Sequence, residues 1–254
     1  MRILKVNPGS YMNKILVCPI AFNENVKLKN VIERFLKCSV RNKVDYLVVD
    51  DCSEDGTSEL INSCSGQGVM TIRHQQRQGV GAAIRTAIKF AREKKYEALV
   101  IMAGNDKDDP QQISNLIDPI FNEGYDFVQG SRYLGKNGTG GDMPFYRKLA
   151  TRAHPIIMSI ITRRKVTDST NGFRAFKLSI FDDKNIDIDQ AWLDKYELEP
   201  YLMYKAIKLG YRFKEAGVTK IYPSRKLGYT KMRPVTGWWS IVRPLIFLGL
   251  GIKK

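Results

Sequence analysis

Residues 46–61 (YLVVDDCSEDGTSELI) constrain the fold more than any other segment. An apolar run ends in two adjacent carboxylates, Asp50 and Asp51, and a helical pattern begins at residue 57. Strands of a parallel sheet are buried on both faces and are therefore continuous apolar runs. Ligands of such sheets bind beyond the carboxyl ends of the strands. The segment predicts a parallel α/β sheet with both carboxylates at its ligand-binding edge.

The alternation of strand and helix patterns continues along the chain. It predicts a doubly wound, mainly parallel sheet flanked by helices. Strands are predicted at residues 14–20, 45–49, 69–73, 98–102, 126–130 and 218–222, with a return to the sheet at 166–176. Helices are predicted at residues 26–36, 57–64, 81–94, 110–121, 145–162 and 197–208. The Gly- and Asn-rich segment 135–141 predicts a mobile loop, a composition that would permit a lid.

Length and charge limit the class of protein. A chain of 254 residues with 43% hydrophobic residues suits one α/β domain with an appendage, and its net charge of +15 indicates an anionic partner. Nucleic-acid binding is not expected, because no helix-turn-helix, RRM or zinc pattern accompanies the charge. The four cysteines form no CxxC pair, which favours reduced thiols in a cytosolic protein. Neither a signal peptide nor a membrane-spanning helix is expected.

The C-terminal segment 237–254 (GWWSIVRPLIFLGLGIKK) differs from the rest in composition. Tryptophans and cationic residues bracket an apolar run, a pattern typical of helices at a membrane–water interface. A helix that packs on the core is the alternative, and interfacial attachment is preferred. The chain is accordingly divided into residues 1–232 as the main domain and residues 233–254 as an interfacial helix or tail.

Three segments at predicted strand ends indicate a nucleotide site. They are Phe22-Asn23-Glu24, the acidic turn 50–57, and RQGVGAAIR at 77–85. Together they resemble the donor-binding segments of inverting GT-A (family 2) glycosyltransferases. The resemblance implies that Phe22 stacks near the base, Glu24 meets the nucleoside and Asp51 contacts the base. It also implies that Gly79 permits close approach of the donor and that Arg85 neutralises its phosphate. The simpler alternative is structural: Asn23-Glu24 opens a helix, and Asp55-Gly56-Thr57 forms a turn and cap.

The segment 100–110 (VIMAGNDKDDP) departs from that family. The family places an Asp-x-Asp pair here to hold a divalent metal, but the matching positions are Ala103 and Asn105. A hard cation prefers carboxylate oxygens. Asn105 and Asp106 are the candidate ligands for Mg²⁺ or Mn²⁺, with Asp108 a further candidate. Alternatively, Lys107 neutralises the donor diphosphate directly and the reaction depends little on metal.

Motifs in the second half narrow the resemblance to polyprenyl-phosphate glycosyltransferases related to dolichyl-phosphate mannose synthase. The motifs are Gly130-Ser131-Arg132-Tyr133, the segment 144–149 with Thr151, DSTNGFR at 168–174, and RKLGYTK at 225–231. The resemblance implies acceptor-binding roles for Arg132, Arg147, Thr151, Arg225 and Lys231, and places Asp168 near the reacting centre.

The chemistry of a phosphate acceptor explains these cations. A phosphate monoester has a second pKa of about 6, so it is already a nucleophile near neutral pH. The enzyme must position one anion beside another, for which Arg132, Arg147 and Lys231 are suited as catalytic residues. Asp168 either supports the oxocarbenium-like transition state or holds a cation in place. His74 and His154 show no partner in the sequence pattern.

The expected function is sugar transfer from a UDP- or GDP-linked sugar to a polyprenyl phosphate. The protein would lie peripherally on the anionic cytoplasmic membrane surface. Two alternatives stay open. One is transfer to a saccharide hydroxyl, for which Asp168 would have to act as a general base. The other is a nucleotide-sugar-binding protein with little turnover.

Overall fold

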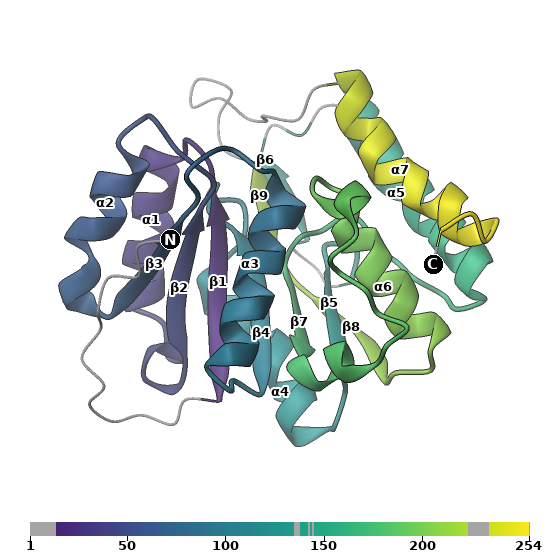
Figure 1. Cartoon of the computed structure of the whole chain (residues 1–254), viewed down its shortest axis with the longest axis horizontal. Coiled ribbons are helices and arrows are strands. Elements are labelled where there is room, and N and C mark those ends of the chain that lie inside the picture. The colour runs from purple at the N-terminus through teal and green to yellow at the C-terminus, as the bar shows by residue number, and fades with distance from the viewer. Residues whose placement is uncertain (1–13, 135–137, 142, 144, 223–233, 254) are drawn as a thin grey trace.

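A seven-stranded sheet forms the centre of the computed structural model (Figure 1). The structure describes residues 14–134, 138–141, 143, 145–222 and 234–253. The strand order is β3-β2-β1-β4-β7-β5-β8, and neighbouring strands are parallel except where β7 pairs with β4 and β5. The bounds are β1 Ile15–Ala21, β2 Asp45–Asp50, β3 Val69–Arg73, β4 Ala98–Ala103, β5 Phe127–Ser131, β7 Arg174–Lys177 and β8 Phe213–Gly217. The predicted α/β fold with a mostly parallel sheet is confirmed.

Helices cover both faces of the sheet, and each face has its own core. One core contains residues of α1 (Asn25–Leu36), α2 (Thr57–Ser63) and α4 (Ile113–Asn122). The other contains residues of α3 (Val80–Glu93), α5 (Phe145–Thr162), α6 (Leu198–Lys208) and α7 (Pro234–Gly249). The apolar strands β1, β2 and β4 contribute alternate side chains to both cores, as expected for strands buried on two faces.

The late part of the chain differs from the prediction. The return segment forms β7, which runs antiparallel to its neighbours. The predicted strand at 218–222 is β9 (Lys220–Tyr222), which pairs with β6 (Thr139–Gly141) in a separate two-stranded sheet. The strand that joins the main sheet is β8, just before it in the chain, and it was not predicted. Part of the predicted loop is therefore the strand β6, while residues 135–137 lie outside the described part.

Helix α7 lies along α5 and α6 (Figure 1). Leu245 and Leu248 are buried in the core, whereas Trp239 is 51% exposed and Leu250 beyond the helix is 72% exposed. One side of the helix thus packs on the domain, and other apolar residues face outward. In the part of the chain that the structure describes, no helix has the length and apolar character needed to cross a bilayer.

Candidate functional site

A cleft of about 840 Å³ opens at the carboxyl ends of the strands. The chain order of the sheet reverses at β1, which lies between β2 and β4. Ligands of open α/β sheets bind at such a switch point. The predicted site residues that line the cleft are Phe22, Glu24, Asp51, Gly79, Asn105, Lys107, Arg132, Arg147 and Thr151.

The Asp51 carboxylate is fixed by hydrogen bonds just beyond β2. The backbone amides of Gln78 and Gly79 each donate to it at 2.8 Å, and Nδ1 of His74 lies 2.8 Å from its Oδ1. Burial alone would raise the pKa of Asp51, but these hydrogen bonds hold the pKa below its ordinary value. The cleft therefore contains an ionised carboxylate, held in place, that can accept hydrogen bonds from a ligand. The sequence pattern indicated no partner for His74, but its ring contacts both Asp51 and Thr86.

Asp50 is directed into the fold. Its carboxylate accepts hydrogen bonds from the backbone amide of Ser53 at 3.0 Å and from the hydroxyl of Ser58. Asp55 closes the turn that follows, since it accepts from the backbone amide of Thr57 at 3.1 Å. Of the two adjacent carboxylates, Asp51 is the one that reaches the cleft.

Two glycines at the start of α3, the N-cap Gly79 and Gly81, bring two stretches of backbone together. A Cβ atom on Gly81 would lie 2.0 Å from the carbonyl oxygen of Leu193, and one on Gly79 would lie 2.5 Å from that of Asp194. Gly79 also has φ of +110°, a conformation that side chains disfavour. These glycines are therefore required for the 193–195 segment to pack against the start of α3. The sequence pattern did not predict this contact.

Arg85 does not line the cleft. Its Nε donates to the carbonyl oxygen of Ile188 at 2.6 Å, and its Nη1 lies 2.8 Å from the carboxylate of Asp194. The expected contact with a donor phosphate is replaced by a structural one, because α3 directs this side chain onto the 188–194 segment.

Around the end of β4, few side-chain oxygens are free to bind a divalent metal. The Ala103 side chain carries no oxygen, and Asn105 offers one amide Oδ1, which is buried without a hydrogen-bond partner in the described structure. Asp106, expected as a ligand, is directed toward α1, where it contacts Arg34 at 2.5 Å and Asn30 at 3.1 Å. That placement is a correction to its predicted role in donor and metal binding.

Asp108 is occupied as well. Its Oδ1 lies 2.6 Å from Nζ of Lys220, and its Oδ2 accepts from the backbone amide of Ala103 at 3.0 Å. Across the described residues, no three or more His, Cys, Asp or Glu side chains are grouped so that they could hold a metal ion. Mg²⁺ and Mn²⁺ favour several hard oxygen ligands. The described residues therefore do not fit a divalent cation that the protein alone would hold.

Basic side chains occupy this part of the cleft instead. Lys107 is 6% exposed, and its Nζ lies 5.3 Å from the centroid of the Tyr222 ring. The guanidinium of Arg147 lies 5.8 Å from the same ring. Burial, followed by the charges of Arg147, Lys220 and Lys27, lowers the pKa of Lys107 to about 7. The cations in this region are crowded and partly desolvated.

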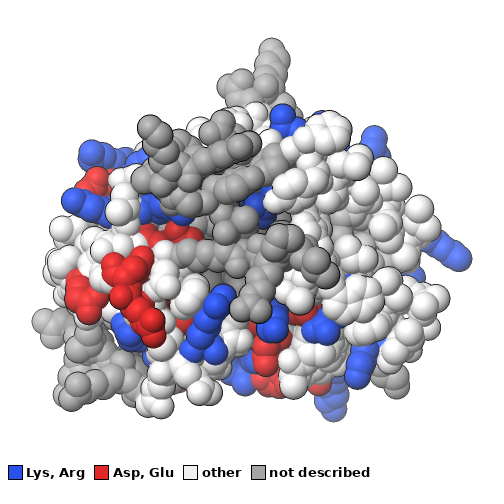
Figure 2. All heavy atoms as spheres, turned by 90° about the horizontal axis from the view of Figure 1, so that it is seen from above, with Lys and Arg blue, Asp and Glu red and all other residues white. Residues whose placement is uncertain are grey.

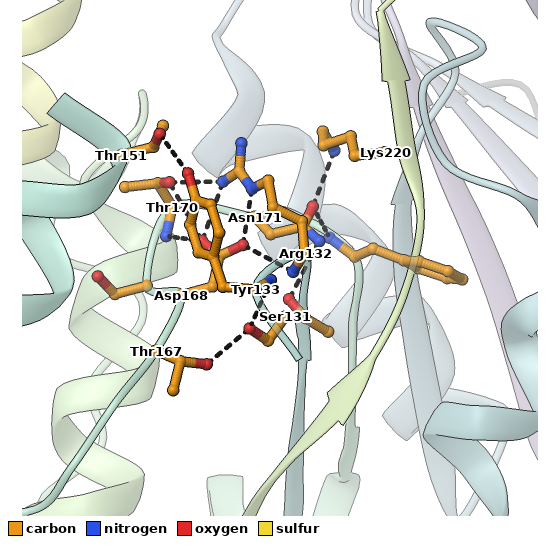
Figure 3. Close-up of polar contacts among 12 residues, drawn as sticks. Ser131, Arg132, Tyr133, Thr151, Thr167, Asp168, Thr170, Asn171 and Lys220 are labelled. Atoms are coloured by element: carbon orange, nitrogen blue, oxygen red, sulfur yellow. Dashed lines mark hydrogen bonds and ion pairs between the residues drawn. The ribbon is translucent and has the colours of Figure 1, made fainter. Parts of the chain in front are cut away.

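Arg132 and Asp168 form a buried ion pair beside these cations (Figure 3). Nε and Nη2 of Arg132 donate to the two oxygens of Asp168 at 2.7 and 2.9 Å. Arg132 also donates to Thr170 at 2.6 Å and to Tyr222 at 3.0 Å. Asp168 thus holds a cation in place, the second of its two predicted roles.

Helices α5 and α7 form another part of the cleft wall. Arg147 and Thr151 come from α5, and Trp238 and Ile241 from α7. The Nη1 atom of Arg147 is buried without a hydrogen-bond partner among the described residues. Thr151 is within 2.6 Å of the Tyr133 hydroxyl (Figure 3), which ties α5 to the loop after β5.

Several lining residues were not predicted from the sequence. Lys220 and Tyr222 belong to β9, whose sheet partner was not evident, and Glu199 lies at the start of α6. The unpredicted polar and aromatic lining also includes Lys27, Arg77, Ser169, Thr170, Arg174, Lys195, Tyr196 and Trp238. Arg225 and Lys231, predicted to bind the acceptor, lie outside the described residues.

Comparison with known proteins identifies the family of this chain. Residues 17–184 match the model of Glycosyl transferase family 2. The undecaprenyl-phosphate mannosyltransferase of Micrococcus luteus is 28% identical, covering 74% of this chain and 75% of that protein. The polyprenol monophosphomannose synthase of Mycolicibacterium smegmatis is 27% identical, covering 86% of this chain and 81% of that protein.

Solved structures share the fold at low sequence identity. Glucosyl-3-phosphoglycerate synthase from Mycobacterium tuberculosis, in complex with Mn²⁺, UDP and phosphoglyceric acid, has a TM-score of 0.63 at 17% identity and covers 96% of this chain and 80% of its own. Mannosyltransferase PcManGT from Pyrobaculum calidifontis, in complex with GDP-Man and Mn²⁺, has a TM-score of 0.57 at 16% identity. The match covers 87% of this chain and 59% of that longer chain.

The chain belongs to Glycosyl transferase family 2, because the family model covers most of its length. It is a glycosyltransferase with a GT-A-like fold, and its relatives include enzymes named for sugar transfer to polyprenyl phosphates. The resemblance inferred from the motifs is confirmed.

Proposed function

We propose that this enzyme transfers a sugar from a nucleotide diphosphate sugar to a polyprenyl phosphate, with inversion at the anomeric carbon. One observation carries the proposal: a single cleft joins the fixed Asp51 carboxylate to a cluster of cations, and part of its wall is made by α5 and α7. The names of the polyprenyl-phosphate relatives support this acceptor class.

The reaction follows from the charges in the cleft. An oxygen of the acceptor phosphate attacks the anomeric carbon, the bond to the donor diphosphate breaks, and its electron pair leaves with the nucleoside diphosphate. The acceptor needs no general base, since its phosphate is already ionised near neutral pH. Arg147 and Arg132 position the acceptor, and Asp51 orients the nucleoside through its base. Catalysis therefore rests on positioning and on stabilising the leaving diphosphate.

A lipid acceptor also agrees with the outer surface of α5 and α7. Leu149, Ile156 and Ile160 of α5 are 64%, 59% and 69% exposed. Figure 2 shows this side of the molecule largely without charge, with Lys and Arg at its margin. We treat residues 1–232 as the catalytic domain and 233–254 as a helix that, with α5, rests on an anionic cytoplasmic membrane surface.

Transfer to a saccharide hydroxyl is the less favoured function. That reaction requires a general base within reach of the acceptor. Asp168 was the predicted base, but its carboxylate is 0% exposed and bound to Arg132. The contacts of Asp168 therefore favour an acceptor that is already anionic.

The test is product formation by the purified protein. The protein is incubated with a panel of UDP- and GDP-linked sugars and a short polyprenyl phosphate, in parallel with Mn²⁺, Mg²⁺ or EDTA. We expect a lipid-linked sugar phosphate of inverted anomeric configuration, detected by mass spectrometry and NMR. Nucleotide binding without any lipid product in all three arms would reject this function and favour a saccharide acceptor or a non-catalytic binder.

Membrane attachment has its own test. Sedimentation with vesicles that contain phosphatidylglycerol should fall at least fivefold for Ile160→Glu. The matched control is Phe121→Glu, because Phe121 is an exposed aromatic of α4, a helix that lies away from α5 and α7 in Figure 1. Equal sedimentation of both variants would contradict the proposed membrane-facing surface.

A further inference from the structure

Four cations from four different elements line the cleft next to the segment after β4. Lys27 belongs to α1, Lys107 follows β4, Arg147 belongs to α5 and Lys220 to β9. The backbone amide of Ile221 donates to the carbonyl oxygen of Lys107 at 2.9 Å, which holds β9 beside this segment. Distant parts of the sequence are thus brought together to place like charges side by side.

Like charges so close together are unfavourable unless an anion compensates them. Glu24 lies 3.1 Å from Lys27, and Asp108 lies 2.6 Å from Lys220. The other carboxylates that line the cleft are engaged elsewhere in the described structure: Asp51 with His74, and Glu199 with Arg174 at 3.2 Å. Glu24 also acts on Lys107, because its charge favours the protonated lysine and raises the pKa of that side chain. Four described cations thus face two described carboxylates, Glu24 and Asp108, so this part of the cleft suits a ligand with more than one negative charge.

The same segment offers a metal few free oxygen ligands. Ala103 removes one oxygen ligand, and Lys220 occupies the carboxylate of Asp108. Lys107 stands two residues beyond Asn105, in the segment where the family's metal-binding pair would lie. A lysine ammonium binds phosphate as a point charge, much as a metal ion would.

We propose that Lys107, assisted by Lys27, Arg147 and Lys220, binds the donor diphosphate directly and replaces the divalent cation. The inference rests on the proposed function, because it assigns a binding site within the same cleft. As the bond to the anomeric carbon breaks, the diphosphate gains negative charge, and these cations stabilise it. Sugar transfer by this chain then proceeds without a metal.

The test is calorimetric titration of the full chain with UDP and with GDP, in EDTA and in Mn²⁺. We expect the better of the two nucleotides to bind in EDTA, with a Kd within threefold of its value in Mn²⁺. Lys107→Met should weaken binding in EDTA at least tenfold. Lys29→Met is the matched control, because Lys29 is an exposed lysine of α1 that loses the same charge. It should change Kd less than twofold.

Each result separates the two proposals. Binding that requires Mn²⁺, or that Mn²⁺ tightens tenfold or more, overturns the metal-free site while leaving a nucleotide site intact. Equal Kd values for Lys107→Met and Lys29→Met overturn the role of Lys107. Absence of binding in every condition, by protein that melts cooperatively, rejects the donor site itself. The comparison of EDTA with Mn²⁺ uses the wild-type chain, so it holds even if Lys107→Met does not fold.

Discussion

Arg132 and Asp168 form a bidentate ion pair in which the side chains are only 2% and 0% exposed. Arg132 follows β5, and Asp168 lies in the segment that leads to β7. Burial alone would raise the pKa of Asp168, but the charge and hydrogen bonds of Arg132 hold it below its ordinary value. The pair therefore ties the 167–171 segment to the sheet and keeps a cation at the cleft.

Replacement of Asp168 by Asn should destabilise the protein strongly. The guanidinium of Arg132 would stay buried without its counter-charge, which costs about 3–5 kcal/mol in comparable buried pairs. Urea unfolding measures the loss. The matched control is Asp182→Asn, which breaks the exposed pair with Arg92 at 2.7 Å and should cost less than about 1 kcal/mol. Similar small losses in both variants would contradict the assigned importance of the buried pair.

Asp51→Asn should weaken nucleoside diphosphate binding at least tenfold. An amide cannot accept all the hydrogen bonds that Gln78, Gly79 and His74 direct at this side chain, because one of its atoms is itself a donor. Calorimetric titration with UDP and GDP measures the change. Glu54→Gln, an exposed neighbour of the same charge, should bind as the wild type does. An unchanged Kd for Asp51→Asn would remove Asp51 from the donor site.

The sequence predicted the parts of the fold that depend on patterns within short segments. Apolar runs located β1, β2 and β4, and chain order placed Phe22, Asp51 and Lys107 at the same sheet edge. Pairing of β7 in the antiparallel sense and of β9 with β6 depends on contacts between distant segments, and no local pattern encodes those.

The same distinction explains the errors in the candidate site. Arg85 and Asp106 occur in motif-like positions, but their partners, Asp194 and Arg34, lie 109 and 72 residues away in sequence. Lys220 was not predicted as a site residue for the same reason. It comes close to Asp108 only because β9 packs beside the segment after β4. A motif predicts where in the fold a residue lies, and tertiary contacts determine which partners its side chain reaches.

Gly81→Ala should lower stability by about 1–3 kcal/mol, as overpacking does in close-packed interiors. The added Cβ would lie 2.0 Å from a carbonyl oxygen of the 193–195 segment, so backbone must move. Gly66→Ala is the control: nothing lies within 4 Å of its Cβ, and the change should be neutral or slightly stabilising. Thermal unfolding of the two variants compares them directly. Equal melting temperatures would show that the 193–195 segment yields without cost.

His154 should make stability fall as the pH drops from about 6.5 to 4. Its Nδ1 lies 2.6 Å from the Ser169 hydroxyl, and its Nε2 lies 3.1 Å from the carbonyl oxygen of Ile241, so it connects α7 to the residue after Asp168. Burial lowers the pKa of His154 to about 4. The unfolded chain therefore binds a proton in this range that the folded chain excludes, and stability falls by up to about 1.4 kcal/mol per pH unit.

The variant His154→Gln isolates this effect, because glutamine does not titrate. Its free energy of unfolding is measured with urea at intervals between pH 4 and 7, beside that of the wild type. Carboxylates titrate in both proteins and cancel in the difference. The difference should be constant above about pH 6.5, the ordinary histidine value, and should shrink steadily below it as the wild type loses its advantage. Parallel curves throughout would mean that His154 is not the buried neutral link between α7 and the 168–171 segment.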